Sequence, residues 1–319
     1  MIPFTLPIVN YIVRKIVKIG VMAAFAWWVT LSYAEPLKQC PPPQGVALQV
    51  LGSGGPIADD ARASSAYLVW VDGKSRVLID AGGGSFLRFG EAQANFNDLD
   101  FIGLSHFHTD HSADFPALLK SGNFSDRDRP LPIAGPDGDG IFPGLKQYLR
   151  ATFNAEDGAY AYLSSFLDGT NDTPMLTPRE VAAGEPAVVY TSEALSVDAL
   201  HVPHGIVPSV AFRVVIGDQV LVFASDQNGD DPSFVDFAKG ASILVMHMVV
   251  PQDVAGVGRR LHAPPSVIGD IAGKVAPGKL VLSHFMARSL RELEQNVALV
   301  RKSYQGEIVL AEDLACVTP

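Results

Sequence analysis

The sequence predicts a mixed fold of the α/β (α+β) class, in which two packed β-sheets are covered by helices. Three observations lead to this fold class. The chain has 319 residues, of which 48% are hydrophobic and 18% charged, so it can bury a large core. Runs of β-forming residues fall into two halves of the chain, with helical patterns between and after them. Its 29 glycines and 23 prolines suit many short elements joined by tight turns.

Short β-type runs separated by Gly-rich turns predict the strands of the first half, at residues 46–51, 67–71, 77–79 and 101–104. Apolar residues at helical spacing then predict helices over residues 113–120 and over most of residues 141–170. The second half begins near Ala187, with strands expected at residues 195–199, 210–215, 219–223, 243–246 and 280–282. Further helices are expected over residues 265–272 and 290–303.

The N-terminal segment has the features of a signal peptide. Basic residues precede an apolar run at residues 19–34, and small side chains stand at Ser32 and Ala34, where a signal peptidase reads them. We expect residues 1–34 to be removed on export, leaving residues 35–319 as one domain in the periplasm or outside the cell, with no stable membrane association. The alternative is an uncleaved membrane anchor, although a helix needs about 20 apolar residues to span a bilayer and this run is shorter.

Charge and cysteine content bear on partners and compartment. Removal of residues 1–34 takes away three basic residues and no acidic one, which changes the formal net charge from −10 to −13. Because so acidic a surface repels nucleic acid, we do not expect nucleic acid as a partner. Cys40 and Cys316 lie near the two ends of the mature chain and can pair as one disulfide in an oxidising compartment. Two free thiols are the alternative.

A group of ligand-type residues follows the strand predicted at residues 101–104. His106 and His108 stand two positions apart, so in an extended segment both imidazoles point to the same side. Asp110 and His111 follow where the chain turns into a helix, and they can aim at a second point nearby. Nitrogen ligands with one carboxylate suit Zn²⁺, and also Fe or Mn. This cluster predicts a metal site.

The HxHxDH stretch at residues 106–111 resembles the most specific motif of the metallo-β-lactamase superfamily, and the resemblance extends over residues 46–315. Four further residues occur in segments that resemble the other motifs of this superfamily, in the same order: Asp80, His204, Asp226 and His284. The resemblance implies a four-layer αββα sandwich. It also implies two divalent metal ions per chain, with Zn²⁺ the expected ion and no other cofactor.

The same resemblance assigns the ligands. His106, His108 and His204 would hold one metal, and Asp110, His111 and His284 would hold the other. Asp226 would bridge both ions, and Asp80 would support a ligand by accepting a hydrogen bond from its ring N–H. His201, three residues before His204, is the rival third ligand.

Two other histidines have open roles. His247 ends an apolar strand and is either a core residue or a support for a ligand. His262, followed by Ala263-Pro264, resembles the histidine loop that donates a proton in ribonuclease Z-like members of the superfamily. Pro264 stands where that loop has a hydroxyl residue, which puts the role of His262 in doubt.

Within the superfamily, the chain resembles the ribonuclease Z and arylsulfatase-like branch. Residues 130–136 resemble its strand and turn, and His284 followed by Arg288 resembles its last motif. The chain departs from this branch at His247-Met248, where a His-Glu pair is expected, and it contains no Gly/Pro/Lys-rich arm that would grip tRNA.

The resemblance implies ester hydrolysis by a hydroxide that bridges two metals, with Asp110 orienting the hydroxide and His262 supplying a proton to the leaving oxygen. We expect a phosphodiester or sulfate ester of a small molecule as substrate. Lactone or β-lactam hydrolysis is the runner-up, and a non-hydrolytic protein that binds two metals is a third alternative. A homodimer is compatible with the resemblance. Aromatic residues of the segment 141–170 form either a pocket wall or ordinary helix core: Tyr148, Phe153, Tyr160, Tyr162 and Phe166.

Overall fold

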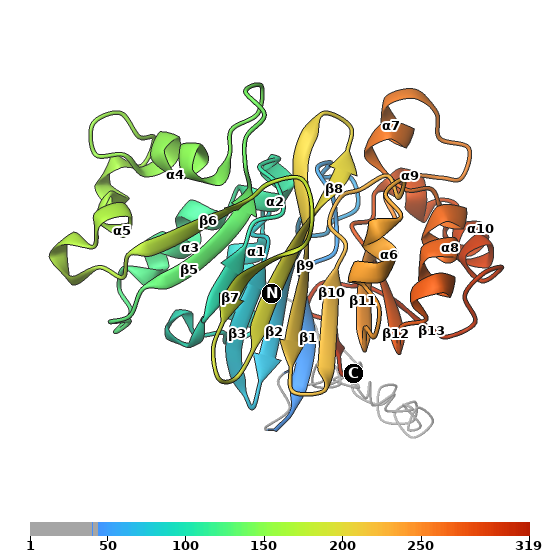
Figure 1. The fold of residues 1–319 in the computed structure, drawn as a ribbon, viewed down its shortest axis with the longest axis horizontal. Helices are drawn as coiled ribbons and strands as arrows, with labels where there is room; N and C mark the ends of the chain where they lie inside the picture. The colour runs from blue at the N-terminus through green and yellow to red at the C-terminus, as the bar shows by residue number, and fades with distance from the viewer. Residues whose placement is uncertain (1–39, 41–43) are drawn as a thin grey trace, which may run out of the picture. The chain divides into compact units, whose positions relative to one another are not determined.

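Two seven-stranded β-sheets form the centre of the protein in the computed structural model, which describes Cys40 and residues 44–319 (Figure 1). The first sheet has the order β14 (Cys316–Val317), β1 (Val46–Gly52), β2 (Ala66–Val71), β3 (Lys74–Ile79), β4 (Phe101–Gly103), β5 (Leu131–Pro136) and β6 (Leu176–Val181). The second has the order β13 (Glu307–Leu310), β12 (Lys279–Ser283), β11 (Ile243–His247), β10 (Gln219–Phe223), β9 (Val207–Ile216), β8 (Ser196–His204) and β7 (Ala187–Thr191). The predicted signal peptide, residues 1–34, lies outside the described residues.

Each sheet combines antiparallel and parallel strands. Strands β3 to β6 are parallel in the first sheet, and β10 to β13 are parallel in the second. Parallel neighbours need long connections, which here include the helices. Their carboxyl ends gather along one edge of each sheet, which is where α/β proteins bind ligands.

The helices cover the outer faces of the two sheets (Figure 1). On the first sheet and its connections lie α1 (Ser85–Glu91), α2 (Thr109–Ser112), α3 (Phe115–Gly122), α4 (Leu145–Phe153) and α5 (Ser165–Asp168). With the second sheet lie α6 (Ser233–Phe237), α7 (Gly256–Leu261), α8 (Pro265–Val275), α9 (Ala287–Leu290) and α10 (Leu293–Val300). Among the described residues, no helix is both long and apolar enough to cross a membrane.

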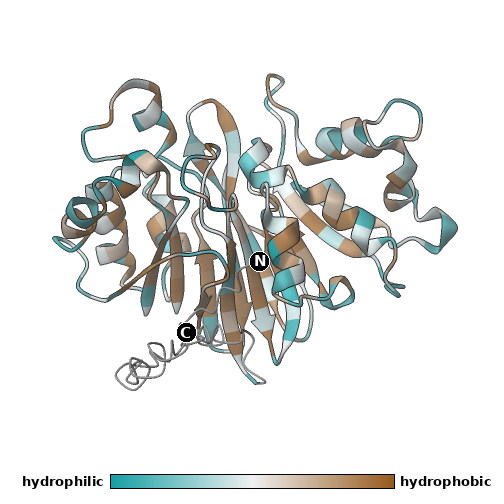
Figure 2. Cartoon of the chain, turned by 180° about the vertical axis from the view of Figure 1, so that it is seen from behind, coloured by the Kyte–Doolittle hydropathy of each residue, from teal (hydrophilic) through white to brown (hydrophobic). Residues whose placement is uncertain are grey.

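One apolar core joins the facing sides of the two sheets. It includes Leu48 and Val69 from the first sheet and Phe212 and Leu221 from the second, all buried. A second cluster packs the other face of the first sheet against its helices, with Phe115 fully buried. Figure 2 shows the apolar residues concentrated on the strands and the hydrophilic ones on loops and helix surfaces. The predicted four-layer sandwich is therefore confirmed.

Several predicted elements differ from those observed. Residues 141–170 contain only α4 and the one-turn α5 as α-helices, because α4 ends before Asn154, whose backbone angles (φ −56°, ψ 139°) are not helical. The helix predicted over residues 290–303 is the shorter α10, and a separate short helix, α9, ends at Leu290. Strand β6 was not predicted because it contains Pro178, which an edge strand tolerates since one side of the strand is unpaired.

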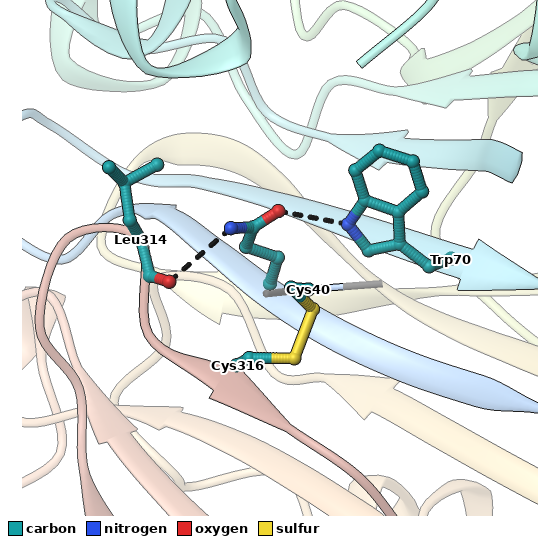
Figure 3. Close-up of a disulfide and its surroundings, with 5 residues drawn as sticks. Cys40, Trp70, Leu314 and Cys316 are labelled. Atoms are coloured by element: carbon teal, nitrogen blue, oxygen red, sulfur yellow. Dashed lines mark hydrogen bonds between the residues drawn. A yellow bond between two sulfur atoms is a disulfide. The ribbon is translucent and has the colours of Figure 1, made fainter. Parts of the chain in front are cut away.

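A disulfide joins Cys40 to Cys316 across 276 residues, with their Cα atoms 5.6 Å apart (Figure 3). The first of the two predicted alternatives is thus confirmed. The Gln49 side chain supports this corner: its Oε1 accepts a hydrogen bond from Trp70 Nε1 at 2.9 Å, and its Nε2 donates to Leu314 O at 3.3 Å. Strand β14 is therefore held to β1 by backbone pairing, the Gln49 side chain holds Leu314 just before it, and the disulfide ties it to Cys40.

Candidate metal centre

The seven predicted ligands lie together in the structure. Most of them follow the carboxyl ends of strands: His106 and His108 after β4, His204 at the end of β8, Asp226 after β10, and His284 after β12. Asp110 and His111 lie on the short helix α2. Gly82 permits α2 to lie close against the backbone that follows β3, because a Cβ at Gly82 would lie 2.1 Å from Asp110 O.

The first group of candidate ligands is His106, His108 and His204, whose ring nitrogens lie within 4.8 Å of one another. Nε2 of His106 is 3.0 Å from Nδ1 of His108, as the spacing of the two residues predicted. Nδ1 of His204 donates a hydrogen bond to Leu261 O at 2.8 Å. This bond fixes the tautomer and turns the unprotonated Nε2 into the cluster, where it is buried without a hydrogen-bond partner.

The second group is Asp110, His111 and His284. Nε2 of His111 and Nε2 of His284 are 3.1 Å apart, and Asp110 Oδ2 lies 3.2 Å from the latter. Nδ1 of His111 donates to Asp80 Oδ2 at 2.8 Å. Asp80 also accepts hydrogen bonds from the backbone N–H and the hydroxyl of Ser105, so it supports a candidate ligand from behind.

Asp226 lies between the two groups. Its Oδ2 is 3.6 Å from His204 Nε2 on one side and 3.7 Å from His111 Nε2 on the other. Its Oδ1 is 3.4 Å from His284 Nε2. Burial raises the pKa of this carboxyl group, but the surrounding imidazoles, His284 first among them, lower it well below the ordinary value. One ionised carboxylate thus reaches both groups.

His247 supports Asp226 directly. Its Nδ1 donates a hydrogen bond to Asp226 Oδ1 at 2.7 Å, and its Nε2 lies 3.0 Å from the Tyr67 hydroxyl. The Tyr67 hydroxyl is also 2.9 Å from Ser283 Oγ. Sequence reasoning gave no role to Tyr67, which lies in an apolar strand and resembles a core residue, and none to Ser283, although Ser283 directly precedes His284.

His262 and His201 occupy very different places. His262 caps the end of α7 and is buried, with Nδ1 3.7 Å from Asp226 Oδ2 and without a hydrogen-bond partner. Burial lowers the pKa of His262 to about 3. His201 is half-buried within β8, opposite Val210, and belongs to none of the described clusters that could hold a metal.

A cavity of about 510 Å³ opens onto these groups. Its wall includes His108, Asp110, His204, Asp226, His262 and His284, together with Pro56, Phe107, Leu261, Met286 and Arg288. A ligand in the cavity can therefore contact both groups of candidate ligands, the imidazole of His262 and one guanidinium.

The aromatic residues of the segment 141–170 divide between the two predicted roles. Phe153 and Phe166 are fully buried core residues, so the pocket-wall alternative is wrong for them. Tyr148 stacks on Phe107 with ring centroids 4.5 Å apart and thus backs the cavity wall. Tyr160 and Tyr162 are exposed and line a separate cavity beside α3.

The site fits divalent metal ions. The buried and unpartnered Nε2 of His204 needs an electron-pair acceptor, which a cation provides. Burial lowers the pKa of His106 well below its ordinary value, so this imidazole is neutral, the form that binds metal. Despite burial, Asp110 and Asp80 raise the pKa of His111. The carboxylates therefore favour positive charge at this point of the cluster.

Comparisons with known proteins identify the family of this chain. The family model described as a beta-lactamase superfamily domain matches residues 75–285. Ribonuclease Z of Mycolicibacterium paratuberculosis is 28% identical over 282 residues, which are 84% of this chain and 96% of the relative. Ribonuclease Z of Mycobacterium bovis is 27% identical over 285 residues, again 84% of this chain and 96% of the relative.

Two solved structures share the fold. The metallo-beta-lactamase fold protein YhfI from Bacillus subtilis has a TM-score of 0.65 at 22% identity, covering 85% of this chain and 98% of its own. The short form of human tRNase Z has a TM-score of 0.65 at 20% identity, with the same coverage.

These comparisons correct one expectation. The acidic net charge argued against nucleic acid as a partner, but relatives that match 84% of the chain are ribonucleases. The reasoning was wrong because net charge describes the whole surface, whereas recognition depends on local groups, and here Arg288 lines the cavity. The resemblance to the ribonuclease Z branch is confirmed by the same relatives. With the family model matching most of its length, the chain belongs to the metallo-β-lactamase superfamily.

Proposed function

We propose that this protein hydrolyses phosphodiester bonds with the help of two divalent metal ions, Zn²⁺ being the expected ion. The observation that carries the proposal is the position of Asp226, whose one carboxylate reaches two adjoining groups of imidazoles at the wall of a single cavity. The ribonuclease Z relatives support a phosphodiester as the bond that is cleaved.

The ligand assignment follows the two groups. His106, His108 and His204 would hold one ion, Asp110, His111 and His284 the other, and Asp226 would contact both. When bound, such ions supply Lewis acidity to phosphoryl oxygens and lower the pKa of water towards neutrality. Hydrogen bonds from behind keep two of the rings in place, since Asp80 orients His111 and the carbonyl of Leu261 orients His204.

Two residues have proposed catalytic roles. Burial raises the pKa of Asp110, but His111 and His284 outweigh this effect and lower it to about 2. Asp110 is thus ionised at pH 7, and its carboxylate can accept a hydrogen bond from an attacking water. His262 presents an unpartnered Nδ1 at the cavity wall, and a proton on this atom can pass to the leaving oxygen. Burial lowers the pKa of His262 to about 3, so the free imidazole is neutral, and the proposed role requires that an anionic diester beside the ring raise this pKa.

Export is part of the proposal. The Cys40–Cys316 disulfide supports it, because such bonds persist in oxidising compartments such as the periplasm and the cell exterior. N-terminal sequencing of the exported protein is expected to begin at Glu35. Recovery of the full-length chain in the membrane fraction would instead identify residues 1–34 as an anchor.

A substrate panel tests the proposed reaction. Purified protein loaded with Zn²⁺ is assayed on bis-p-nitrophenyl phosphate, on a tRNA transcript extended at both ends, and on a sulfate ester, a lactone and a β-lactam. Turnover of the diester or the RNA that stops with a chelator and returns with metal is the expected result. Turnover of only the sulfate, lactone or β-lactam would keep the metal centre and reject the substrate class.

A further inference from the structure

The ring of His284 is held differently from the other imidazoles of the second group. Nδ1 of His111 has a hydrogen bond to Asp80, 2.8 Å away. Nδ1 of His284 is buried and has no hydrogen-bond partner. Metal-binding imidazoles are usually oriented through this second ring nitrogen. Another part of the chain must therefore fix the orientation of the His284 ring.

The backbone at Gly55 packs against the His284 ring and limits its orientation. A Cβ added at Gly55 would lie 2.7 Å from Cε1 and 2.9 Å from Nδ1 of His284, so only a bare backbone fits beside the ring. The same loop is hydrogen-bonded to the next residue, Phe285. Phe285 N donates to Ser53 O at 2.8 Å, and Gly55 N donates to Phe285 O at 3.1 Å. The loop thus contacts the ring and also pairs with the backbone that carries it.

Asp313, between β13 and β14, fastens both ends of this loop. Its Oδ1 accepts hydrogen bonds from the backbone N–H and the hydroxyl of Ser53, at 3.1 and 2.8 Å. Its Oδ2 accepts one from Ala63 N at 2.8 Å and lies 3.2 Å from Arg88 Nη2. The Asp313 side chain is only 12% exposed. One carboxylate therefore closes residues 53–63 into a fixed loop.

Arg62 adds a second connection between the loop and the C-terminal segment. Its Nη1 donates to Ser53 Oγ at 2.6 Å and to Ala311 O at 2.9 Å. Its guanidinium lies over the ring of Phe285, 5.4 Å from the centroid. The loop, the C-terminal segment and the residue after His284 thus form one connected unit.

We propose that Asp313 is a positioning residue for His284, acting through the loop of residues 53–63. The inference rests on the proposed metal centre. Loss of the Asp313 carboxylate would free the loop beside the ring and weaken the second group of ligands. No hydrogen bond among the described residues joins the first group, His106, His108 and His204, to this loop, so the first group would keep its ion.

The test compares Asp313→Asn with Glu91→Gln in the full protein. Glu91 is the matched control, because its carboxylate binds the same guanidinium, 2.7 Å from Arg88 Nη1, from an exposed position on α1. In metal-free protein, amide hydrogen exchange at Gly54, Gly55 and Phe285 is expected to accelerate in Asp313→Asn only. In remetallated protein, chelator titration is expected to show retention of one ion weakened about 10–100-fold, with the other ion unchanged.

The outcomes separate this inference from the proposed function. Wild-type exchange rates together with wild-type retention of both ions in Asp313→Asn would overturn the positioning role. A wild-type protein that binds no ions would overturn the metal centre and the inference that rests on it. Gly55→Ala disturbs the ring directly with Asp313 intact, so it is expected to lose the same ion even if Asp313→Asn does not fold. Retention of both ions by Gly55→Ala would also contradict the proposal.

Discussion

Asp226 and His247 form a buried pair in which Nδ1 of the imidazole donates to Oδ1 of the carboxylate at 2.7 Å. The hydrogen bond holds one carboxylate oxygen and leaves Oδ2 facing His204 and His111. Burial lowers the pKa of His247 to about 4, while its bond to Asp226 opposes that shift. His247 is therefore a neutral donor at pH 7, and it determines how Asp226 is turned.

Replacing His247 by Leu is expected to weaken retention of both metal ions about 10–100-fold, because Asp226 serves both ligand groups. Chelator titration of the remetallated variant measures this loss. Tyr67→Phe is the control, since it removes only the hydroxyl behind the ring and is expected to have a smaller effect. Weakening of a single ion, or none, would argue against a bridging position of Asp226.

His204→Ala is expected to lose one metal ion, whereas His201→Ala retains both. His204 presents an unpartnered Nε2 to the cluster, while His201 lies three residues earlier in β8, outside the clusters that could hold a metal. Metal analysis of the two purified variants decides between them. The reverse result would move the ligand three residues upstream.

His262→Ala is expected to discriminate between leaving groups. A diester with an alkyl or nucleoside leaving group needs a proton and is expected to slow about 10²–10⁴-fold. A p-nitrophenyl diester needs little help from an acid and is expected to slow far less. Metal content, measured beside kcat, is expected to stay at the wild-type level. Equal losses on both substrates would mean that His262 is not the proton donor.

Removing the disulfide with the double variant Cys40→Ser, Cys316→Ser is expected to lower the free energy of unfolding by about 2–4 kcal/mol, since the bond closes a long loop of the unfolded chain. Urea denaturation measures the change. Wild-type protein in reducing agent is the matched control and is expected to unfold at the same urea concentration as the double variant. Equal stability of oxidised wild type and double variant would show that β14 is held by its other contacts.

Much of the metal centre could be predicted from the sequence because its first part is local. His106, His108, Asp110 and His111 lie within six residues, so their spacing alone indicates a metal site. The other candidate ligands were found only through resemblance to known motifs. These ligands follow β8, β10 and β12, which lie in one sheet with β9 and β11 between them, so the order of the strands brings the ligands together. The sequence of a single segment does not show that order.

The supporting residues could not be predicted for the same reason. Tyr67 reads as a core residue of β2, and its contact with His247 exists only because two sheets pack face to face. Asp313 lies 260 residues from Ser53 and reads as an ordinary loop aspartate. The disulfide was easier to predict from the sequence, because the chain has only two cysteines and a single pairing is possible. Short elements such as α1 and β13 have too few residues to show a period.

The number of divalent ions bound per chain tests the central claim most directly. Elemental analysis of purified, remetallated wild-type protein is expected to give about two ions per chain, the number that a shared carboxylate between two ligand groups implies. Asp226→Ala is expected to retain far less metal, because its carboxylate reaches both groups. Fewer than about one ion in the wild type after remetallation would contradict the account, since two-metal hydrolysis requires both sites.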